Sequence, residues 1–287
     1  MSKIGVIGGS GLYDIEEFEH KKRLRLDTPF GNPSDEFILA KCKGKDIVFL
    51  SRHARGHKLS PSQINYRANI YGMKSLGVER IISLTACGSL KQEYKPLDFV
   101  IPEQFVDRTN QARNYTFFDQ GITAHINFAH PICNDLAGVL YQAAKRVGVS
   151  VHFGGIYLNM EGPQFSTLAE SNLYRSWGMD IIGMTNMTEA RLAREAEMCY
   201  ATLAAVTDYD CWHESHTSVT VEMILDNLKK NVENSKRILT ETITQIGDQQ
   251  TCSCQHALKY SIVTAPESIP KQAKKRLRII IGKYIKQ

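Results

Sequence analysis

Short apolar runs bounded by glycine alternate with longer segments of helical periodicity along almost the whole chain. Continuous apolar runs of this length are typical of strands that are buried on both faces of a sheet. Strands and helices in alternation predict an α/β fold with a mixed, mostly parallel β-sheet flanked by helices. The predicted strands cover residues 4–8, 36–41, 46–51, 80–85, 97–101, 151–158, 180–184 and 199–207.

The segments between these runs carry the boundaries of helices. One segment begins with Ser60 and Pro61, a cap followed by proline at the first helical position, and stops at Gly77. From Thr220 onward apolar residues recur every three to four positions, which predicts a long amphipathic helix. The predicted helices that stop at glycine cover residues 61–76, 134–147 and 167–177.

Composition and charge exclude several classes of protein. The 287 residues are 43% hydrophobic and 23% charged, and no apolar run approaches the roughly 18 residues of a membrane span. The formal net charge of +5 is too small to indicate a nucleic-acid binder. A strand signal begins almost at once and leaves no room for a secretory signal. We therefore expect a cytoplasmic protein with no nucleic-acid and no membrane partner.

The chain shows no linker, low-complexity tract or internal repeat. We expect one domain over residues 1–265, followed by a basic C-terminal extension over residues 266–287. The extension combines the basic stretch KQAKKRLR with the apolar stretch IIIGKYIK. It fits either a solvated end that packs its isoleucines on the body or on a neighbouring subunit, or an amphipathic arm for an acidic partner. Packing is favoured, because the stretch is short and Tyr284 is its only aromatic residue.

Seven cysteines are scattered along the chain, which is not the pattern of a disulfide-stapled secreted scaffold. Cys252 and Cys254 form a Cys-x-Cys pair that stands alone in the sequence, whereas a zinc site gathers four ligands. We therefore expect reduced thiols and no metal. A disulfide within the pair stays open as the alternative.

Two carboxylates, Asp208 and Asp210, follow the last apolar run. Like charges close together in a partly buried site raise the pKa of a carboxyl group, so that it keeps its proton and can donate it. A purine leaving group needs such a donor at N7. The pair therefore indicates catalysis at a nucleobase.

Three polar clusters follow predicted strands in the first ninety residues. They contain Ser10 in a glycine-rich turn, Arg52 and His53 in a basic loop, and Thr85 and Ala86 before a glycine. Glycine-rich backbone, hydroxyl groups and arginine all bind oxyanions. The carboxyl ends of strands gather the ligands of α/β folds, and no magnesium-type carboxylate accompanies these clusters. We expect one free oxyanion, of which inorganic phosphate fits, although each cluster alone would also fit a plain turn or loop.

Two later clusters offer apolar contact surfaces. Phe165 and Ser166 lie in EGPQFS, which supplies an aromatic face for a base and, at Glu161, a carboxylate for sugar hydroxyls. Met184 lies in GMTN after another strand and is a soft apolar platform. Both segments would also fit a turn with a core side chain.

These segments recur in family order as GGSG, TPFG, SRHARGH, TACGS, EGPQFS, GMTN and TDYDCW. From Ile4 to about Ile246 the chain resembles the trimeric purine nucleoside phosphorylase family, and within it the members that cleave methylthioadenosine. The resemblance implies a nucleoside phosphorylase fold with a distorted, barrel-like sheet. It also implies reversible phosphorolysis of methylthioadenosine to adenine and 5-methylthioribose 1-phosphate. Phosphate is then a co-substrate, no cofactor or metal is needed, and the assembly is a homotrimer or a hexamer formed as a dimer of trimers.

The resemblance assigns roles to individual positions. Asp208 and Asp210 would bind adenine at N7 and the 6-amino group, Met184 would lie against the ribose, and Phe165 and Ser166 would lie at the base. Val221, Ile224 and Leu225 would line the pocket for the methylthio group. The residues that would hold phosphate are Ser10, Arg52, His53, Thr85, Ala86 and Thr185.

Two further likenesses are more distant. His125 matches a histidine that the adjacent subunit contributes in the family. The Cys-x-Cys pair looks like that of thermophilic archaeal members, whereas the basic extension departs from shorter ones.

The hypothesis that follows is a loose displacement at C1′, in which phosphate attacks opposite the purine while protonated Asp208 donates to N7. A 6-oxopurine nucleoside phosphorylase of the same fold is the first alternative, although an asparagine at position 208 would favour it. A metal-dependent hydrolase that uses Asp208, Asp210, His213 and His216 is a second alternative. A nucleotide sensor without turnover is a third.

Overall fold

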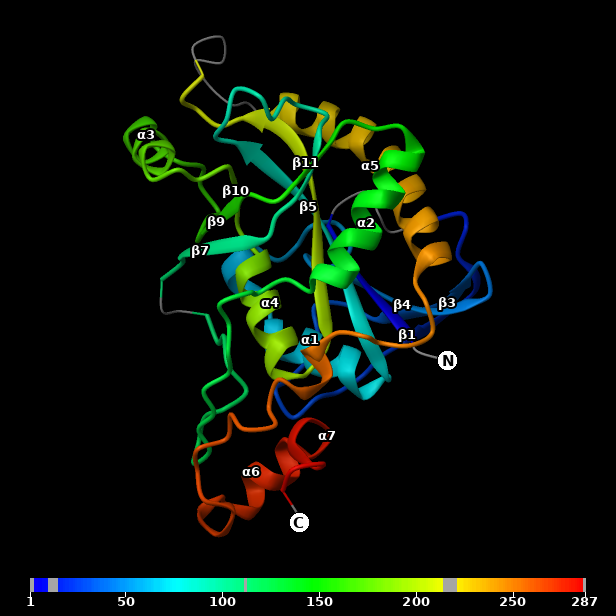
Figure 1. Cartoon of the computed structure of the whole chain (residues 1–287), viewed down its shortest axis with the longest axis vertical. Coiled ribbons are helices and arrows are strands. Elements are labelled where there is room, and N and C mark those ends of the chain that lie inside the picture. Colours follow the sequence, from blue (N-terminus) through cyan, green and yellow to red (C-terminus); the bar gives the residue numbers. More distant parts are fainter. Residues whose placement is uncertain (1–2, 10–14, 111–112, 214–220, 286–287) are drawn as a thin grey trace.

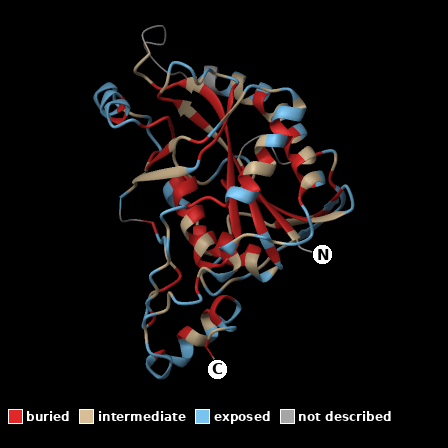
Figure 2. Cartoon of the chain, viewed as in Figure 1, coloured by how far each residue is buried: buried red, intermediate tan, exposed pale blue. Residues whose placement is uncertain are grey.

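The computed structural model describes residues 3–9, 15–110, 113–213 and 221–285, with only the backbone described at residues 221, 223 and 224. In this part of the chain one sheet of eleven strands forms the centre of the molecule (Figure 1). Two long neighbours, β5 (Val78–Ser89) and β11 (Cys199–Tyr209), pair in parallel over almost their whole length. Both are buried along most of their length, as expected of strands that are covered on both faces (Figure 2).

Strand β5 changes partner along its length. Its first half pairs in parallel with β1 (Lys3–Gly8) as far as Ser83, and its last two residues pair antiparallel with β10 (Ile181–Gly183). Between these two pairings one edge of β5 has no neighbouring strand. The sheet therefore opens at this point.

The remaining strands extend from this centre on three sides. β1 continues through β4 (Lys45–Ser51), β3 (Phe37–Cys42) and β2 (Glu19–Leu24). β10 continues through β9 (Ile156–Met160) and β7 (Gln104–Arg108), and β11 continues through β6 (Phe99–Ile101) and β8 (Val151–Phe153). The mixed, mostly parallel α/β sheet predicted from the sequence is confirmed.

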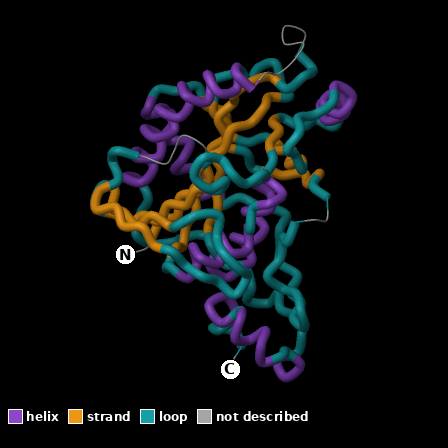
Figure 3. The backbone as a smooth tube through the Cα atoms, turned by 180° about the vertical axis from the view of Figure 1, so that it is seen from behind, coloured by secondary structure: helices purple, strands orange, loops and turns teal. Residues whose placement is uncertain are grey.

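Helices cover both faces of the sheet, as the view from behind in Figure 3 also shows. α2 (Asn134–Val147) and α5 (Val221–Gln245) pack together against β11, while α1 (Tyr66–Ser75) and α4 (Asn186–Glu195) pack together on β5 and β11. α3 (Leu168–Ser176) lies at the margin beyond β9 and β10. None of the described helices has the length and apolar character needed to cross a membrane.

The C-terminal segment folds back onto the body. Its helices α6 (Lys271–Arg276) and α7 (Arg278–Ile281) lie near α1 at one end of the molecule (Figure 1). Ile280, Ile281 and Ile285 are buried in the same apolar cluster as the core strands. Three of the four isoleucines in IIIGKYIK therefore pack on the protein's own core, while Ile279 is exposed.

The predicted elements are confirmed with three corrections. The segment 151–158 forms two strands, because Gly154 and Gly155 adopt positive φ between them. The predicted helix at 61–76 is wrong at its start, where residues 61–63 form a single 3₁₀ turn before α1 begins under an Asn65 cap. α4, β2 and β7 were not predicted. α4 buries Asn186, Glu189 and Glu195 together with apolar residues, so polar positions interrupt the apolar stripe that identifies a helix.

Candidate active site

A cavity of about 720 Å³ lies where the sheet opens at the carboxyl ends of the central strands. Residues 84–87 of β5, which span the edge without a neighbouring strand, line it together with Gly88. Ten of the residues predicted from the sequence line it as well, namely Arg52, His53, Thr85, Ala86, Phe165, Met184, Thr185, Asp208, Asp210 and Leu225. The rule that ligands gather at strand ends in α/β folds thus accounts for this convergence.

The other predicted residues have different positions. Ser166 does not line the cavity itself. Its hydroxyl lies 3.8 Å from Sδ of Met160, and Met160 is a lining residue. His125 is exposed on a segment whose backbone bonds to Ser261, away from the cavity lining. Ser10 lies outside the described residues, and so do the side chains of Val221 and Ile224.

An irregularity in β11 positions the acidic pair. The register with β5 shifts between Val206 and Asp208, so Thr207 is an extra residue and Asp208 pairs with Gly88. Such a bulge re-aims the side chains that follow it. A β-carbon at Gly88 would lie only 3.2 Å from Oδ2 of Asp208 and 3.7 Å from Cβ of Asp210. A glycine is therefore needed for the two carboxylates to come this close to β5.

The two carboxyl groups are held in a setting that favours their protonated form. The pKa of Asp208 is raised to about 7, chiefly by burial and also by the charge of Asp210, although the hydroxyl of Thr207, which donates to Oδ1 at 2.6 Å, offsets part of the rise. Burial also raises the pKa of Asp210, and interactions with the hydroxyls of Ser171 and Ser166 offset part of this rise. Within the described structure Oδ2 of Asp210 is buried and meets no hydrogen-bond partner. A ligand in the cavity is the natural partner for it.

Helix α5 supports this end of β11 from the other side. Nδ2 of Asn227 donates to the carbonyl of Thr207 at 2.6 Å, and Nδ2 of Asn231 donates to the carbonyl of Val206 at 2.9 Å. Leu228 and Val232 on the same helix line the cavity next to Leu225. The helix thus both fixes the bulge and supplies an apolar wall.

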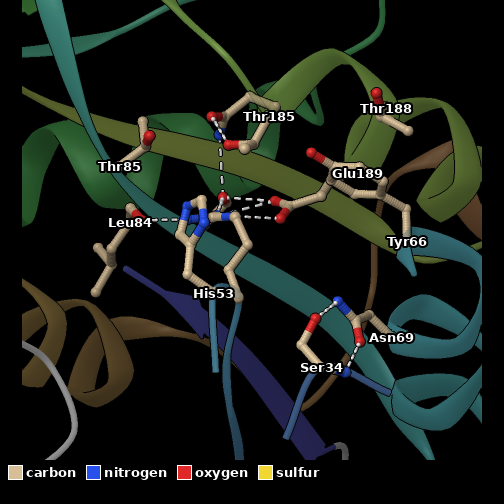
Figure 4. A network of polar contacts seen from close by, with 12 residues as sticks. Ser34, His53, Tyr66, Asn69, Leu84, Thr85, Thr185, Thr188 and Glu189 are labelled. Carbon is tan, nitrogen blue, oxygen red and sulfur yellow. Dashed lines mark hydrogen bonds and ion pairs between the residues drawn. The ribbon is translucent and has the colours of Figure 1, made fainter. Parts of the chain in front are cut away.

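Arg52 is already paired inside the protein. Its guanidinium group is buried and forms a two-pronged ion pair with Glu189, donating from Nε to Oε1 and from Nη2 to Oε2 at 3.1 Å. Two further hydrogens go to the carbonyl of Leu84 at 3.1 Å and to Oγ of Ser83 at 2.6 Å (Figure 4). A guanidinium has five N–H bonds, and among the described residues the second N–H of Nη1 meets no partner, so it can serve a ligand. Glu189 therefore takes the two parallel N–H bonds with which an arginine can clamp a phosphate.

Helix α4 brings its N-terminus to the same place. Thr185 is its N-cap residue and its side chain makes no capping bond to the helix. Asn186 is fixed at the base of the cavity by Tyr157, whose hydroxyl donates to Oδ1 at 3.1 Å, and by Ser83, which accepts from Nδ2 at 3.0 Å. A helix N-terminus favours an anion. Figure 4 shows Thr85, Thr185 and His53 around this region, with Glu189 to one side.

His53 presents an acceptor to the cavity. Its Nδ1 lies 2.9 Å from the carbonyl of Leu59, which can only accept, so Nδ1 carries the hydrogen. Burial and the neighbouring Arg52 charge lower the pKa of His53 to about 4, so the ring is neutral at neutral pH. Nε2 is then a lone pair. It can accept a hydrogen bond from a protonated phosphate oxygen or from a sugar hydroxyl.

Arg113 is a site residue that the sequence analysis missed. Its buried guanidinium donates to the carbonyl of Met184 at 2.6 Å, and it forms an ion pair with Glu161 at 3.0 Å. Ser62 also donates to Glu161. The carboxylate expected to bind sugar hydroxyls is therefore engaged in holding Met184 in place. No local motif surrounds Arg113, so nothing in its neighbourhood could have identified it.

A metal site at the acidic pair has no support in the described part of the chain. There the only side chains close enough to hold an ion are four cysteines far from the cavity. His213 instead stacks on Tyr209 with ring centroids 4.3 Å apart, and His216 lies outside the described residues.

Comparison with known proteins identifies the family. A family model described as the phosphorylase superfamily matches residues 3–244. The chain belongs to the phosphorylase superfamily. This superfamily member is 54% identical to the S-methyl-5′-thioadenosine phosphorylase of Geobacter sulfurreducens over 98% of its own length and 99% of the relative's.

Solved structures agree with this assignment. A methylthioadenosine phosphorylase from an antarctic soil metagenomic library superposes with a TM-score of 0.93 at 43% identity, covering 97% of this chain and 98% of the other. The methylthioadenosine phosphorylase of Schistosoma mansoni, solved with adenine, superposes with a TM-score of 0.85 at 35% identity, covering 94% of this chain and 99% of the other. The nucleoside phosphorylase fold predicted for this phosphorylase is thus confirmed, with its barrel-like sheet opening onto the cavity.

Proposed function

We propose that this chain catalyses the reversible phosphorolysis of S-methyl-5′-thioadenosine to adenine and 5-methylthioribose 1-phosphate. The observation that carries the proposal is a single cavity with two chemically opposite ends. One end presents a carboxyl group, Asp208, whose pKa of about 7 lets it both hold and release a proton near neutrality. The other presents Thr85, Thr185 and one N–H of Arg52 at a helix N-terminus.

The reaction follows from this arrangement. The bond between C1′ and N9 breaks, its electrons pass into the purine, and Asp208 delivers a proton to N7. A phosphate oxygen then forms the new bond at C1′ from the opposite face. General acid catalysis of this kind contributes about 10²- to 10⁴-fold, and a preorganised anion stabilises the cationic sugar that develops between the two ends.

Selectivity for the base comes from Asp210. As a carboxylate acceptor it matches the 6-amino group of adenine, whereas a 6-oxopurine presents a second acceptor there. A buried polar group left unpaired discriminates strongly. At the other end of the nucleoside the apolar wall with Leu225 favours a methylthio group over a hydroxyl by about 1–3 kcal/mol.

The rest of the proposal concerns the assembly. Phosphate is the co-substrate, no cofactor takes part in the reaction, and the enzyme works in the cytoplasm as a homotrimer or as a dimer of trimers. His125 supports the assembly proposal, because it is exposed and remote from its own cavity and so is available to a neighbouring subunit.

A product assay tests the function. Purified enzyme is given methylthioadenosine, adenosine or inosine, with and without phosphate, in the presence of a chelator. Adenine release from methylthioadenosine should require phosphate and survive chelation. Release of base without phosphate would identify a hydrolase, and a preference for inosine would identify a 6-oxopurine phosphorylase.

Asp208→Asn tests the assigned acid. It should lower kcat/KM for methylthioadenosine by about 10²- to 10⁴-fold and shift the relative preference towards inosine. Asp98→Asn is the matched control, because Asp98 is a buried aspartate that bonds His152 outside the cavity. Equal kcat/KM values in the two variants would refute the role of Asp208.

A further inference from the structure

Four cysteines that are distant in sequence meet in one cluster. Their sulfur atoms all lie within 4.8 Å of one another, and the members are Cys133, Cys199, Cys252 and Cys254. The premise that the Cys-x-Cys pair stands alone is therefore wrong. Its two partners come from the start of α2 and from the start of β11, and no sequence spacing could have linked them.

The cluster has the shape of a metal site with four ligands. Zinc–sulfur bonds of about 2.3 Å in a tetrahedron set the sulfurs roughly 3.8 Å apart. Sγ of Cys199 and Sγ of Cys252 lie 3.2 Å apart, which is well beyond the roughly 2.05 Å of a disulfide bond. All seven cysteines of the chain are free thiols in the structure.

A helix N-terminus and an amide donor lie beside two of the sulfur atoms. Cys133 is the N-cap of the fourteen-residue helix α2, where the helix dipole stabilises a negative charge. Nε2 of Gln250 approaches Sγ of Cys199 at 3.4 Å and supplies a further donor to sulfur.

A cation lies next to the cluster. Arg80 is the register neighbour of Cys199 on β5, and paired residues of parallel strands share a face. The arginine is buried and donates from Nη2 to the carbonyl of Gln249 at 2.7 Å, three residues before Cys252. A zinc ion with four thiolates carries two net negative charges, which a buried guanidinium close by would offset.

We propose that these four cysteines form a closed structural zinc site. Three of the four are buried, and no position is left for water or substrate, which separates a structural site from a catalytic one. Binding releases up to four thiol protons and makes no change of oxidation state. The proposal is independent of the proposed function, because Cys199 lies eight residues, roughly 26 Å of extended strand, from Thr207 at the cavity.

The site would fasten the C-terminal segment to the body. Residues 252–254 follow α5, and the chain beyond them runs beside the segment that carries His125, with Ala124 bridged to Ile262 and Thr123 bonded to Val263. Zinc would thus join this layer to β11 and α2. Structural zinc sites contribute directly to folding free energy.

Metal analysis of the purified full-length protein tests the proposal. We expect about one zinc per chain by mass spectrometry. Chelation under mild denaturant should remove it, lower Tm and leave four additional thiols open to alkylation. Cobalt added to the stripped protein should give the intense visible absorption of tetrahedral thiolate coordination. Zinc returned in stoichiometric amount should restore Tm.

A pair of variants separates the site from general effects of losing a buried thiol. Cys254→Ser should lose most of the zinc, whereas Cys42→Ser, a buried cysteine of the core outside the cluster, should keep it. If Cys254→Ser fails to fold, the cobalt spectrum of the wild type still decides. Intact mass showing two disulfides, four free thiols without metal, or iron in place of zinc would each overturn the proposal.

Discussion

The two ends of the cavity solve the problem of buried charge in opposite ways. At the anion end Arg52 is neutralised by Glu189, and every hydrogen but one of its guanidinium is engaged within the protein. At the base end Asp208 and Asp210 are desolvated with no cation to pair them, and one carboxyl oxygen has no partner in the described structure. The polar groups of the anion end are thus almost fully paired within the protein, whereas the carboxyl groups of the base end still need a ligand as partner.

Glu189→Gln, at the anion end, should cause the largest loss of unfolding free energy. It leaves the Arg52 charge buried without its counter-ion, and losing one partner of a buried pair costs about 3–5 kcal/mol. Urea unfolding measures the change in the free energy of unfolding. Glu195→Gln on the same helix is the matched control: burial raises its pKa to about 7, so less charge is removed at neutral pH. An equal loss of unfolding free energy in both variants would show that the ion pair with Arg52 contributes no more than any buried carboxyl group on this helix.

Asp208→Asn should have the opposite effect on stability. A folded-state pKa raised from 3.8 to about 7 means that the folded protein binds more protons between these values. The wild type therefore loses stability as pH rises from about 4 to about 7, at up to roughly 1.4 kcal/mol per pH unit. The asparagine variant lacks this loss, so it should be more stable than the wild type by about 2–4 kcal/mol at pH 8. Near pH 4 the gain should vanish. A gain that is the same at both pH values would rule out this titration.

Thr85→Val should weaken the anion end without unfolding it. The shape is kept and one hydroxyl donor to phosphate is removed, and a bond to a charged group contributes about 1.5–3 kcal/mol. The KM for phosphate should rise at least tenfold while the KM for methylthioadenosine stays nearly constant. Thr244→Val, on the exposed side of α5, is the control. A rise in the nucleoside KM alone would place the hydroxyl at the sugar instead.

Leu225→Ala should give the smallest effect. Leu225 is half exposed at the cavity wall, so truncation removes only part of an apolar contact and should cost about 1 kcal/mol of the preference for methylthioadenosine over adenosine. The ratio of the two kcat/KM values measures it. Leu168→Ala, exposed outside the cavity, should leave the ratio unchanged. A larger preference for methylthioadenosine over adenosine in Leu225→Ala would contradict an apolar pocket at this position.

The sequence predicted features that depend on neighbouring residues. Glycine-bounded apolar runs located most strands, and the acidic pair and the donor-rich turns identified ten residues that share one cavity. It could not predict contacts between distant segments. Glu189 reaches Arg52 from 137 positions away, Arg113 reaches Met184 from 71, and the four cysteines meet from three separate segments. Helix α4 was missed for a related reason, because polar residues interrupt its buried face and two of them, Asn186 and Glu189, are satisfied by side chains from distant strands.

The parting of β1 and β10 along β5 has one more consequence. Between Ser83 and Gly88 the strand has an edge with no neighbour, and exposed edges of this kind invite pairing with foreign chains. Here the bare edge is enclosed, with Arg52 already bound to the carbonyl of Leu84. A nucleoside and a phosphate ion bound along this edge would occupy the place of a neighbouring strand, so the edge would be fully covered only in the ligand-bound protein.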